Sequence, residues 1–272
     1  MEAQADGMLS GKARIRDKGA VRDFWDASPC GTLGVSPQEG SVEFFTEIER
    51  RRYALEPFIF RYADFGRWKG KRVLEIGCGT GTDLLQFLRA GADAWGLDMS
   101  RRSVRLAGKR LGLSGLDGGR VLVGDAEDLP LPSGRFDLVY SWGVLHHTPD
   151  TARAVAEVHR VLRPGGEICI MLYHRWSLVA LQFYLRFGLL RGRPLRGLDE
   201  IMAAHQESPG TRVYTRTQVV DLFARFQDLR ICPVLTPYDL QCGRNLVLPA
   251  SVRRFIPDRL GFFLVARGRK AF

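Results

Sequence analysis

Short apolar runs alternate with longer amphipathic runs along this chain of 272 residues. The short runs are rich in β-branched and aromatic residues, which favours strands, and the longer runs have the spacing of helices. Strands that alternate with helices form a mostly parallel sheet with helices on both faces, so we expect an α/β fold. The expected strands are 71–77, 93–98, 119–125, 136–142, 167–173, 229–235 and 262–268, with helices at 83–90, 100–111 and 151–162.

Two long stretches interrupt this alternation. Residues 1–66 precede the first strand and are partly helical in pattern, which predicts either a cover that excludes water from a site or a helical layer on the sheet. Residues 174–214 follow the fifth strand, and connections of this length are usually functional lids or binding loops. We therefore expect an N-terminal extension and helical cover over 1–66, and a main domain over 67–272 with a lid insertion.

The sequence VLEIGCGTGTD places three glycines at alternate positions directly after the first strand. Because they lack Cβ atoms, Gly77, Gly79 and Gly81 permit positive φ and let a ligand lie against the backbone. An amphipathic run follows, with Thr82 or Asp83 available as its N-cap. The loop is therefore expected at the carboxyl edge of the first strand, where open α/β sheets bind ligands.

The ends of the neighbouring strands bear on which ligand this is. A G-x-G loop also fits a dinucleotide, but G-x-G-x-G after a strand that carries Glu75 suits a zwitterion better than a pyrophosphate. Asp98 ends the second strand, 17 positions after Gly81, where a carboxylate can accept both hydroxyl hydrogens of a ribose. Asp125 and Ala126 follow the third strand at the same edge, beside the expected place of an adenine.

In this order the motifs resemble those of the class I S-adenosylmethionine-dependent methyltransferases, nearest to the ubiquinone, menaquinone and natural-product branch. The resemblance covers about residues 70–175 and includes SWGVLHHTPD after the fourth strand and RVLRPGG before the fifth. It implies a Rossmann-like seven-stranded sheet with an antiparallel last strand, S-adenosylmethionine as cofactor, and LRPGG as the turn into strand five. The glycines would pack on the methionine part of the cofactor, Asp98 would hold its ribose, and Asp125 would meet its adenine. The implied cofactor residues are Glu75, Gly77, Cys78, Gly79, Gly81, Asp98, Met99, Asp125, Ala126, Ser141 and Trp142.

Three residues are candidates for catalysis on the methyl acceptor. His146 follows the fourth strand and is interpreted either as part of the active site or as a structural hydrogen-bonding residue. Tyr173 and His174 end the fifth strand, where a titratable pair can bind an acceptor or take its proton. A sulfonium methyl is already electrophilic, so the protein mainly has to align the nucleophile with the C–S bond. The sequence leaves open which acceptor atom is methylated.

The run WSLVALQFYLRFGLL at 176–190 is apolar almost all round. It can line an apolar acceptor pocket, pack as a buried helix, or lie on a membrane surface with arginines at its ends. The sequence does not decide among these three interpretations. We therefore expect an acceptor that is at least partly apolar, and we keep peripheral membrane contact as a hypothesis.

The net charge of +10 lies entirely in residues 151–272, which hold 19 basic and 9 acidic side chains. These are mostly single arginines, typical of a solvated surface. No aromatic and basic stripe for stacking bases is evident, and SWGV stands where base-methylating relatives carry an N-P-P-aromatic motif. We expect a small-molecule acceptor and no nucleic acid partner. An RNA or protein methyltransferase, or an S-adenosylmethionine-binding protein with another reaction, are the alternatives.

The cysteines and the hydropathy bear on location. Five widely spaced cysteines without C-x-x-C predict reduced thiols and no metal site. No run reaches the roughly 18 apolar residues needed to span a bilayer, and the first residues carry no apolar segment of signal-peptide type. We therefore expect a cytoplasmic protein.

Overall fold

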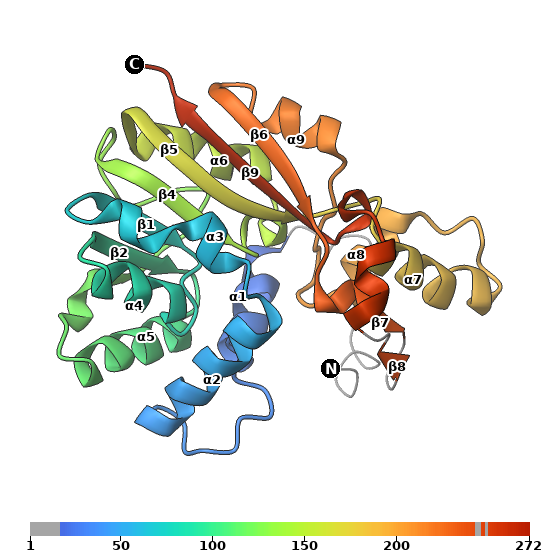
Figure 1. The fold of residues 1–272 in the computed structure, drawn as a ribbon, viewed down its shortest axis with the longest axis horizontal. Coiled ribbons are helices and arrows are strands. Elements are labelled where there is room, and N and C mark those ends of the chain that lie inside the picture. The colour runs from blue at the N-terminus through green and yellow to red at the C-terminus, as the bar shows by residue number, and fades with distance from the viewer. Residues whose placement is uncertain (1–16, 243–245, 248–249) are drawn as a thin grey trace.

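A seven-stranded sheet in the order β3-β2-β1-β4-β5-β9-β6 forms the centre of the molecule (Figure 1). The computed structural model describes residues 17–242, 246–247 and 250–272. Neighbouring strands from β3 to β5 are parallel, whereas β9 lies antiparallel between β5 and β6. The expected Rossmann-like sheet with an antiparallel last strand is therefore confirmed. The strands are β1 (Arg72–Ile76), β2 (Asp93–Asp98), β3 (Val121–Val123), β4 (Phe136–Trp142), β5 (Leu162–Tyr173), β6 (Phe226–Val234) and β9 (Phe263–Lys270).

Helices cover both faces of the sheet. Successive strand residues point to opposite faces, so Met171 and Tyr173 join one buried cluster while Ile170 and Leu172 join the other. The first cluster includes side chains of α4 and α5, and the second includes side chains of α6 and α9. The helices are α4 (Thr82–Arg89), α5 (Arg101–Leu113), α6 (Thr151–Val161) and α9 (Arg216–Leu222), with the turns η3 (Gly118–Arg120) and η4 (Leu145–His147).

Among the described residues, four helical elements precede β1 and pack on this frame. Ser41 caps α2 by accepting a hydrogen bond from the backbone of Phe44, and Phe44 and Ile48 pack with Leu106 of α5. Helix α1 also contacts α5, so the N-terminal elements cover the helices beside β1 and β2. The division of the chain at residue 66 stays a prediction. The elements are α1 (Lys18–Ala27), α2 (Val42–Leu55), α3 (Ile59–Ala63) and η2 (Phe65–Trp68).

The insertion leaves and rejoins the sheet at one place, because His174 and Tyr214 form a parallel bridge. Between them α7 packs on α8, and Figure 1 shows α7 at one end of the molecule, away from β1 and β2. None of the helices in the described ranges is both long and apolar enough to cross a membrane. The remaining elements are α7 (Leu178–Phe187), η5 (Leu189–Arg191), α8 (Leu198–His205), η6 (Pro237–Leu240), β7 (Gln241–Cys242), β8 (Leu246–Val247), η7 (Ala250–Phe255) and η8 (Asp258–Leu260).

Two local expectations are wrong. Strand β5 begins at Leu162, so the LRPGG segment lies within an irregular strand, where the pairing of β4 with β5 shifts register between Phe136 and Leu138. The N-cap of α4 is Gly81, with a left-handed φ of 75°, and not Thr82 or Asp83. Asp83 cannot act as the cap because its fully buried carboxylate binds other side chains, as described below.

Candidate active site

The three glycines after β1 have different surroundings. A Cβ added at Gly77 would lie 2.1 Å from a methyl carbon of Val144, and one added at Gly81 would lie 3.1 Å from the Cβ of Ala107. An added Cβ at Gly79 would meet no heavy atom of the described residues within 4 Å. At Gly77 and Gly81 the missing Cβ atoms therefore also leave room for protein side chains, and contact of the three glycines with the cofactor stays a prediction. Gly79 alone of the three faces open space in this way.

Asp98 links this loop to the next helix. One carboxylate oxygen accepts the backbone N–H of Gly79 at 2.9 Å, and the other accepts that of Ser100 at 2.8 Å. Burial raises the pKa of Asp98 to about 6, although these N–H groups act in the opposite direction. An ionised carboxylate has about four acceptor positions, so two remain for hydroxyl groups of a ligand. The predicted ribose-binding residue is therefore preorganised beside Gly79.

Helix α1 closes over the ends of β2 and β3. The Nζ of Lys18 lies 2.6 Å from Asp125 and 2.5 Å from Glu127, two carboxylates that follow β3. At the other end of α1, Asp26 accepts hydrogen bonds from the Ser100 hydroxyl and the Arg102 backbone. Asp125, the residue expected beside adenine, is thus bound to a side chain of the cover. Sequence reasoning missed Lys18 because 107 positions separate the partners.

A buried charge network lies behind the glycine loop. Asp83 accepts bonds from Arg52 at 3.0 and 2.5 Å, from Tyr53 at 2.9 Å and from Tyr140 at 2.8 Å. Burial alone would raise the pKa of Asp83, but Arg52 and the hydrogen bonds outweigh it and lower this pKa. Nearby, burial and the Asp83 charge raise the pKa of Glu75, whose Oε2 has no hydrogen-bond partner among the described residues. Glu75 is therefore an unsatisfied buried acceptor next to the loop.

The other predicted cofactor residues are engaged by the protein or buried. The Ser141 hydroxyl donates to the backbone oxygen of Ile76 at 3.0 Å, inside the sheet. The Trp142 indole donates to Glu56 at 2.7 Å and stacks near Tyr140. Their contact with a cofactor stays a prediction. The side chains of Cys78 and Ala126 are buried, and that of Met99 is half-buried.

Tyr173 meets a residue of the insertion at the carboxyl end of β5. Its hydroxyl donates to the carboxylate of Glu207 at 3.0 Å. The centre of its ring is 3.8 Å from the ring centre of His146, and the Phe262 ring stacks on it with the ring centres 4.2 Å apart. Tyr173 thus presents a polar tip held among aromatic rings, and its role toward the acceptor stays a prediction.

Glu207 was missed by the sequence reasoning. It lies just after α8 with a φ of 40°, an uncommon conformation for a residue with a side chain, and such strain occurs at functional sites. Its carboxylate is 3.4 Å from Nε2 of His147, whose Nδ1 lies 2.8 Å from the Ser208 hydroxyl. Trp25 of α1 packs edge-on against His147, so the cover also reaches this cluster. The one sequence signal was a polar turn, ESPG, inside the insertion.

The two predicted histidines have different places. His146 is fully buried beside Tyr173, and neither ring nitrogen has a partner in the described part of the chain. Burial lowers the pKa of His146 well below its ordinary value, so its ring is neutral at pH 7. The Nδ1 of His174 lies 3.0 Å from the Gly261 carbonyl. Because successive strand residues point to opposite faces, the side chains of Tyr173 and His174 lie on different sides of the sheet. A role of His174 toward the acceptor stays a prediction.

Cys30 lies in the segment between α1 and α2 and is exposed as a residue. Burial of its thiol raises the pKa of Cys30 to about 12, and the carboxylates of Glu207, Glu56 and Asp98 contribute to the same rise.

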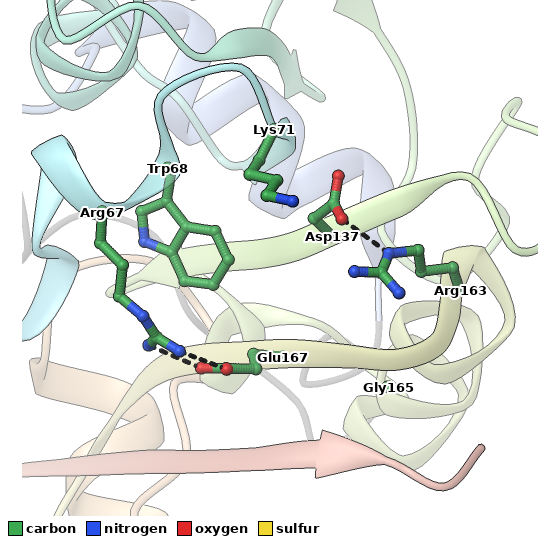
Figure 2. Close-up of a pocket in the computed structure, with 7 residues that line it drawn as sticks. All are labelled: Arg67, Trp68, Lys71, Asp137, Arg163, Gly165 and Glu167. Carbon is green, nitrogen blue, oxygen red and sulfur yellow. Dashed lines mark hydrogen bonds and ion pairs between the residues drawn. The ribbon is translucent and has the colours of Figure 1, made fainter.

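A cavity of about 190 Å³ lies elsewhere, at the amino ends of β1, β4 and β5 (Figure 2). Arg67 and Glu167 form a two-point ion pair across it, and Arg163 pairs with Asp137 at 2.6 Å. Open α/β sheets bind ligands at the carboxyl edge, which is the opposite edge. We therefore assign the site to the residues around Gly79 and Tyr173 and not to this cavity.

Comparison with known proteins agrees with this assignment. Residues 74–170 match the methyltransferase domain family. A phthiotriol/phenolphthiotriol dimycocerosates methyltransferase of Mycobacterium ulcerans is 44% identical over 99 residues, which cover 36% of this chain and 35% of the relative. The demethylmenaquinone methyltransferase of Geobacillus kaustophilus is 27% identical over 179 residues, 61% of this chain and 74% of the relative. The chain thus spans about a third of the length of the mycobacterial relative.

Solved structures show the same fold. An S-adenosylmethionine-dependent methyltransferase of Thermotoga maritima superposes with a TM-score of 0.54 at 20% identity, over 92% of this chain and 99% of that one. The [4+2]-cyclase SpnF superposes with a TM-score of 0.53 at 19% identity, over 96% of this chain and 94% of that one. Residues 74–170 match a methyltransferase domain, and the chain has the Rossmann-like fold of solved S-adenosylmethionine-dependent methyltransferases. We therefore test the site against S-adenosylmethionine, the cofactor predicted from the sequence.

The residues around the glycine loop fit this cofactor. Gly79 offers open space next to the main chain, and Asp98 offers two free acceptor positions for ribose hydroxyls. Glu75 offers a buried acceptor without a partner in the described residues, in a place suited to the methionine ammonium group. The structure therefore offers open space beside the main chain and hydrogen-bond acceptors for both the ribose and the ammonium group of S-adenosylmethionine.

We expect the affinity for S-adenosylhomocysteine to fall as the pH drops below about 6, the pKa of Asp98 in the free protein. Only the ionised carboxylate accepts both ribose hydroxyls, so the contribution of Asp98 to the affinity is complete above this pH. Below it, binding must first remove a proton from Asp98, and each pH unit lowers the affinity by up to about tenfold. Calorimetric titrations from about pH 5 to 8 test this, and Asp98→Asn is the control, which binds weakly and lacks the change near pH 6. A flat profile for the wild type would contradict the assignment.

Proposed function

We propose that this chain transfers the methyl group of S-adenosylmethionine to a hydroxyl group of an apolar, lipid- or quinone-like small molecule. The observation that carries the proposal is the Tyr173 and Glu207 pair, a polar contact among aromatic rings beside the predicted ribose site. An apolar molecule can pack against the aromatic rings around Tyr173, and its hydroxyl group can donate a hydrogen bond to the Glu207 carboxylate. The names of the relatives, which refer to phthiotriol dimycocerosates and demethylmenaquinone, support the same class of acceptor.

Each residue of this cluster has a distinct role in the proposal. The bound cofactor supplies an electrophilic methyl group. Glu207 accepts the proton that the acceptor hydroxyl must lose, because its carboxylate is the acceptor nearest to the Tyr173 tip. Tyr173 donates to that carboxylate and positions it, while His147, at 3.4 Å from Glu207, stabilises its negative charge. His146, neutral and packed on the Tyr173 ring, is a positioning residue.

We expect Glu207→Gln to lower kcat about a hundredfold, since general base catalysis contributes about 10²–10⁴-fold. The amide keeps the size of the side chain but cannot take a proton, so the affinity for S-adenosylhomocysteine stays unchanged. Turnover of methyl-labelled cofactor and calorimetry measure the two effects. The matched control is Glu200→Gln, an exposed glutamate of α8 whose partner is Arg196. Full activity of Glu207→Gln would show that another group takes the proton.

The acceptor class is tested with methyl-labelled S-adenosylmethionine and extract of the source cells. The proposal predicts label in the organic-soluble fraction. Label in nucleic acid or protein would favour a macromolecular acceptor. Binding of the cofactor without any transfer would favour another reaction, and the [4+2]-cyclase among the structural neighbours shows that this fold does not fix the chemistry.

A further inference from the structure

The outer side of the insertion carries a group of large apolar side chains in contact with solvent. Six of the fifteen exposed large apolar side chains in the described residues lie within positions 176–195. Leu190 is 79% exposed and Leu195 is 98% exposed. We call this group the outer patch. It consists of Trp176, Leu181, Leu185, Leu189, Leu190 and Leu195.

The outer patch lies on a helix that is apolar on two sides. Leu181 and Leu185 are four positions apart, so they share one face of α7, and Leu189 follows in η5 just after the C-cap residue Gly188. On the other side Val179 is buried and Phe183 packs against the cluster that contains Tyr173. The interpretation of 176–190 as a buried helix is therefore wrong for its outer face. One side of α7 packs on the buried cluster that includes Tyr173, and the other side faces solvent.

Positive charge surrounds the outer patch. Arg186, Arg191 and Arg193 are exposed beside it, and residues 176–198 contain no acidic side chain. The two acidic residues that follow in α8 are already in ion pairs, Asp199 with Arg175 and Glu200 with Arg196. Apolar side chains flanked by arginines are typical of segments that bind anionic lipid surfaces. A second copy of this chain would present the same positive charge, which disfavours self-association through the patch.

We propose that the outer patch docks on an anionic lipid bilayer, with α7 lying along the membrane surface. Its leucines and Trp176 would enter the interface between headgroups and acyl chains, and its arginines would contact the lipid phosphates. An apolar acceptor could then pass from the bilayer to the Tyr173 cluster along α7 without crossing water. Only this last step rests on the proposed function, because the docking follows from the patch alone.

The test is flotation of the purified full chain with vesicles, without any acceptor or turnover, so its result is independent of the proposed function. We expect binding to vesicles of phosphatidylcholine mixed with phosphatidylglycerol, and weaker binding to phosphatidylcholine alone. Leu185→Glu combined with Leu189→Glu should reduce the partition coefficient at least about tenfold, because buried charge is costly at the interface. Arg191→Gln combined with Arg193→Gln should reduce binding to the anionic vesicles and leave binding to phosphatidylcholine unchanged.

The matched control is Leu113→Glu, an exposed leucine at the end of α5, outside the outer patch. It should bind vesicles like the wild type, and all variants should keep the melting temperature and the affinity for S-adenosylhomocysteine. The proposal is overturned if the wild type stays unbound or if the control variant loses binding as strongly as the patch variants. It is also overturned if light scattering shows that the wild type is a dimer and that only the patch variants are monomers, since a second copy would then cover the patch.

Discussion

Asp98→Ala is expected to weaken S-adenosylhomocysteine binding at least about a hundredfold. Each hydrogen bond to a charged acceptor contributes about 1.5–3 kcal/mol, and Asp98 is placed to accept two from the ribose. Each 1.4 kcal/mol corresponds to about tenfold in affinity. The substitution also removes the contacts to the N–H groups of Gly79 and Ser100, which hold the loop in its ligand-ready form. Isothermal titration calorimetry measures the loss directly.

The matched control lies at the other end of the same strand. Asp93 begins β2 and pairs with Arg120, and its side chain is 46% exposed. Asp93→Ala removes a carboxylate from β2 without touching the glycine loop, so its affinity should equal that of the wild type. If Asp98→Ala binds as tightly as Asp93→Ala, or if the protein binds NAD instead, the cofactor assignment is wrong.

Arg52→Met is expected to lower the free energy of unfolding by about 3–5 kcal/mol, the usual effect of removing one partner of a buried ion pair. Asp83 is fully buried and Arg52 binds both of its carboxylate oxygens. Arg52 also lowers the pKa of Glu56 and Glu75 against the effect of burial, so its loss leaves three buried carboxylates uncompensated. The melting temperature should fall by roughly 10 °C, as measured by calorimetry.

Lowering the pH should reduce the difference in the free energy of unfolding between the wild type and Arg52→Met. The pKa of Asp83 is lowered in the folded protein, so the stability that the pair contributes is present at neutral pH and is lost as the pH falls through the folded-state pKa. In the variant, Asp83 can take up a proton and lose its uncompensated charge. The control is Arg50→Met on the same helix, where the exposed Arg50 pairs with Glu47 and the expected change in the free energy of unfolding is small. Equal destabilisation by both substitutions would show that the buried network does not carry the effect.

The sequence was sufficient for features that depend on short-range pattern. The alternation of apolar residues gave the strands and helices, and the glycine spacing with Asp98 gave the cofactor edge. The pairs Lys18 with Asp125 and Tyr173 with Glu207 are separated by 107 and 34 positions, and no local pattern signals such contacts. The alternation of side chains along a strand, by contrast, is a local pattern, and it already separates the directions of Tyr173 and His174.

The unequal surroundings of the three glycines bear on how this loop can evolve. At position 77 a Cβ would overlap the Val144 side chain, and at position 81 it would press on Ala107 with a left-handed φ of 75°, so a descendant that had given up the cofactor would still favour glycine at both positions. At position 79 the φ of 52° lies in a region that asparagine also adopts, and the space beside it is open. Among related sequences, loss of glycine at this middle position is therefore the substitution that reports a change of ligand.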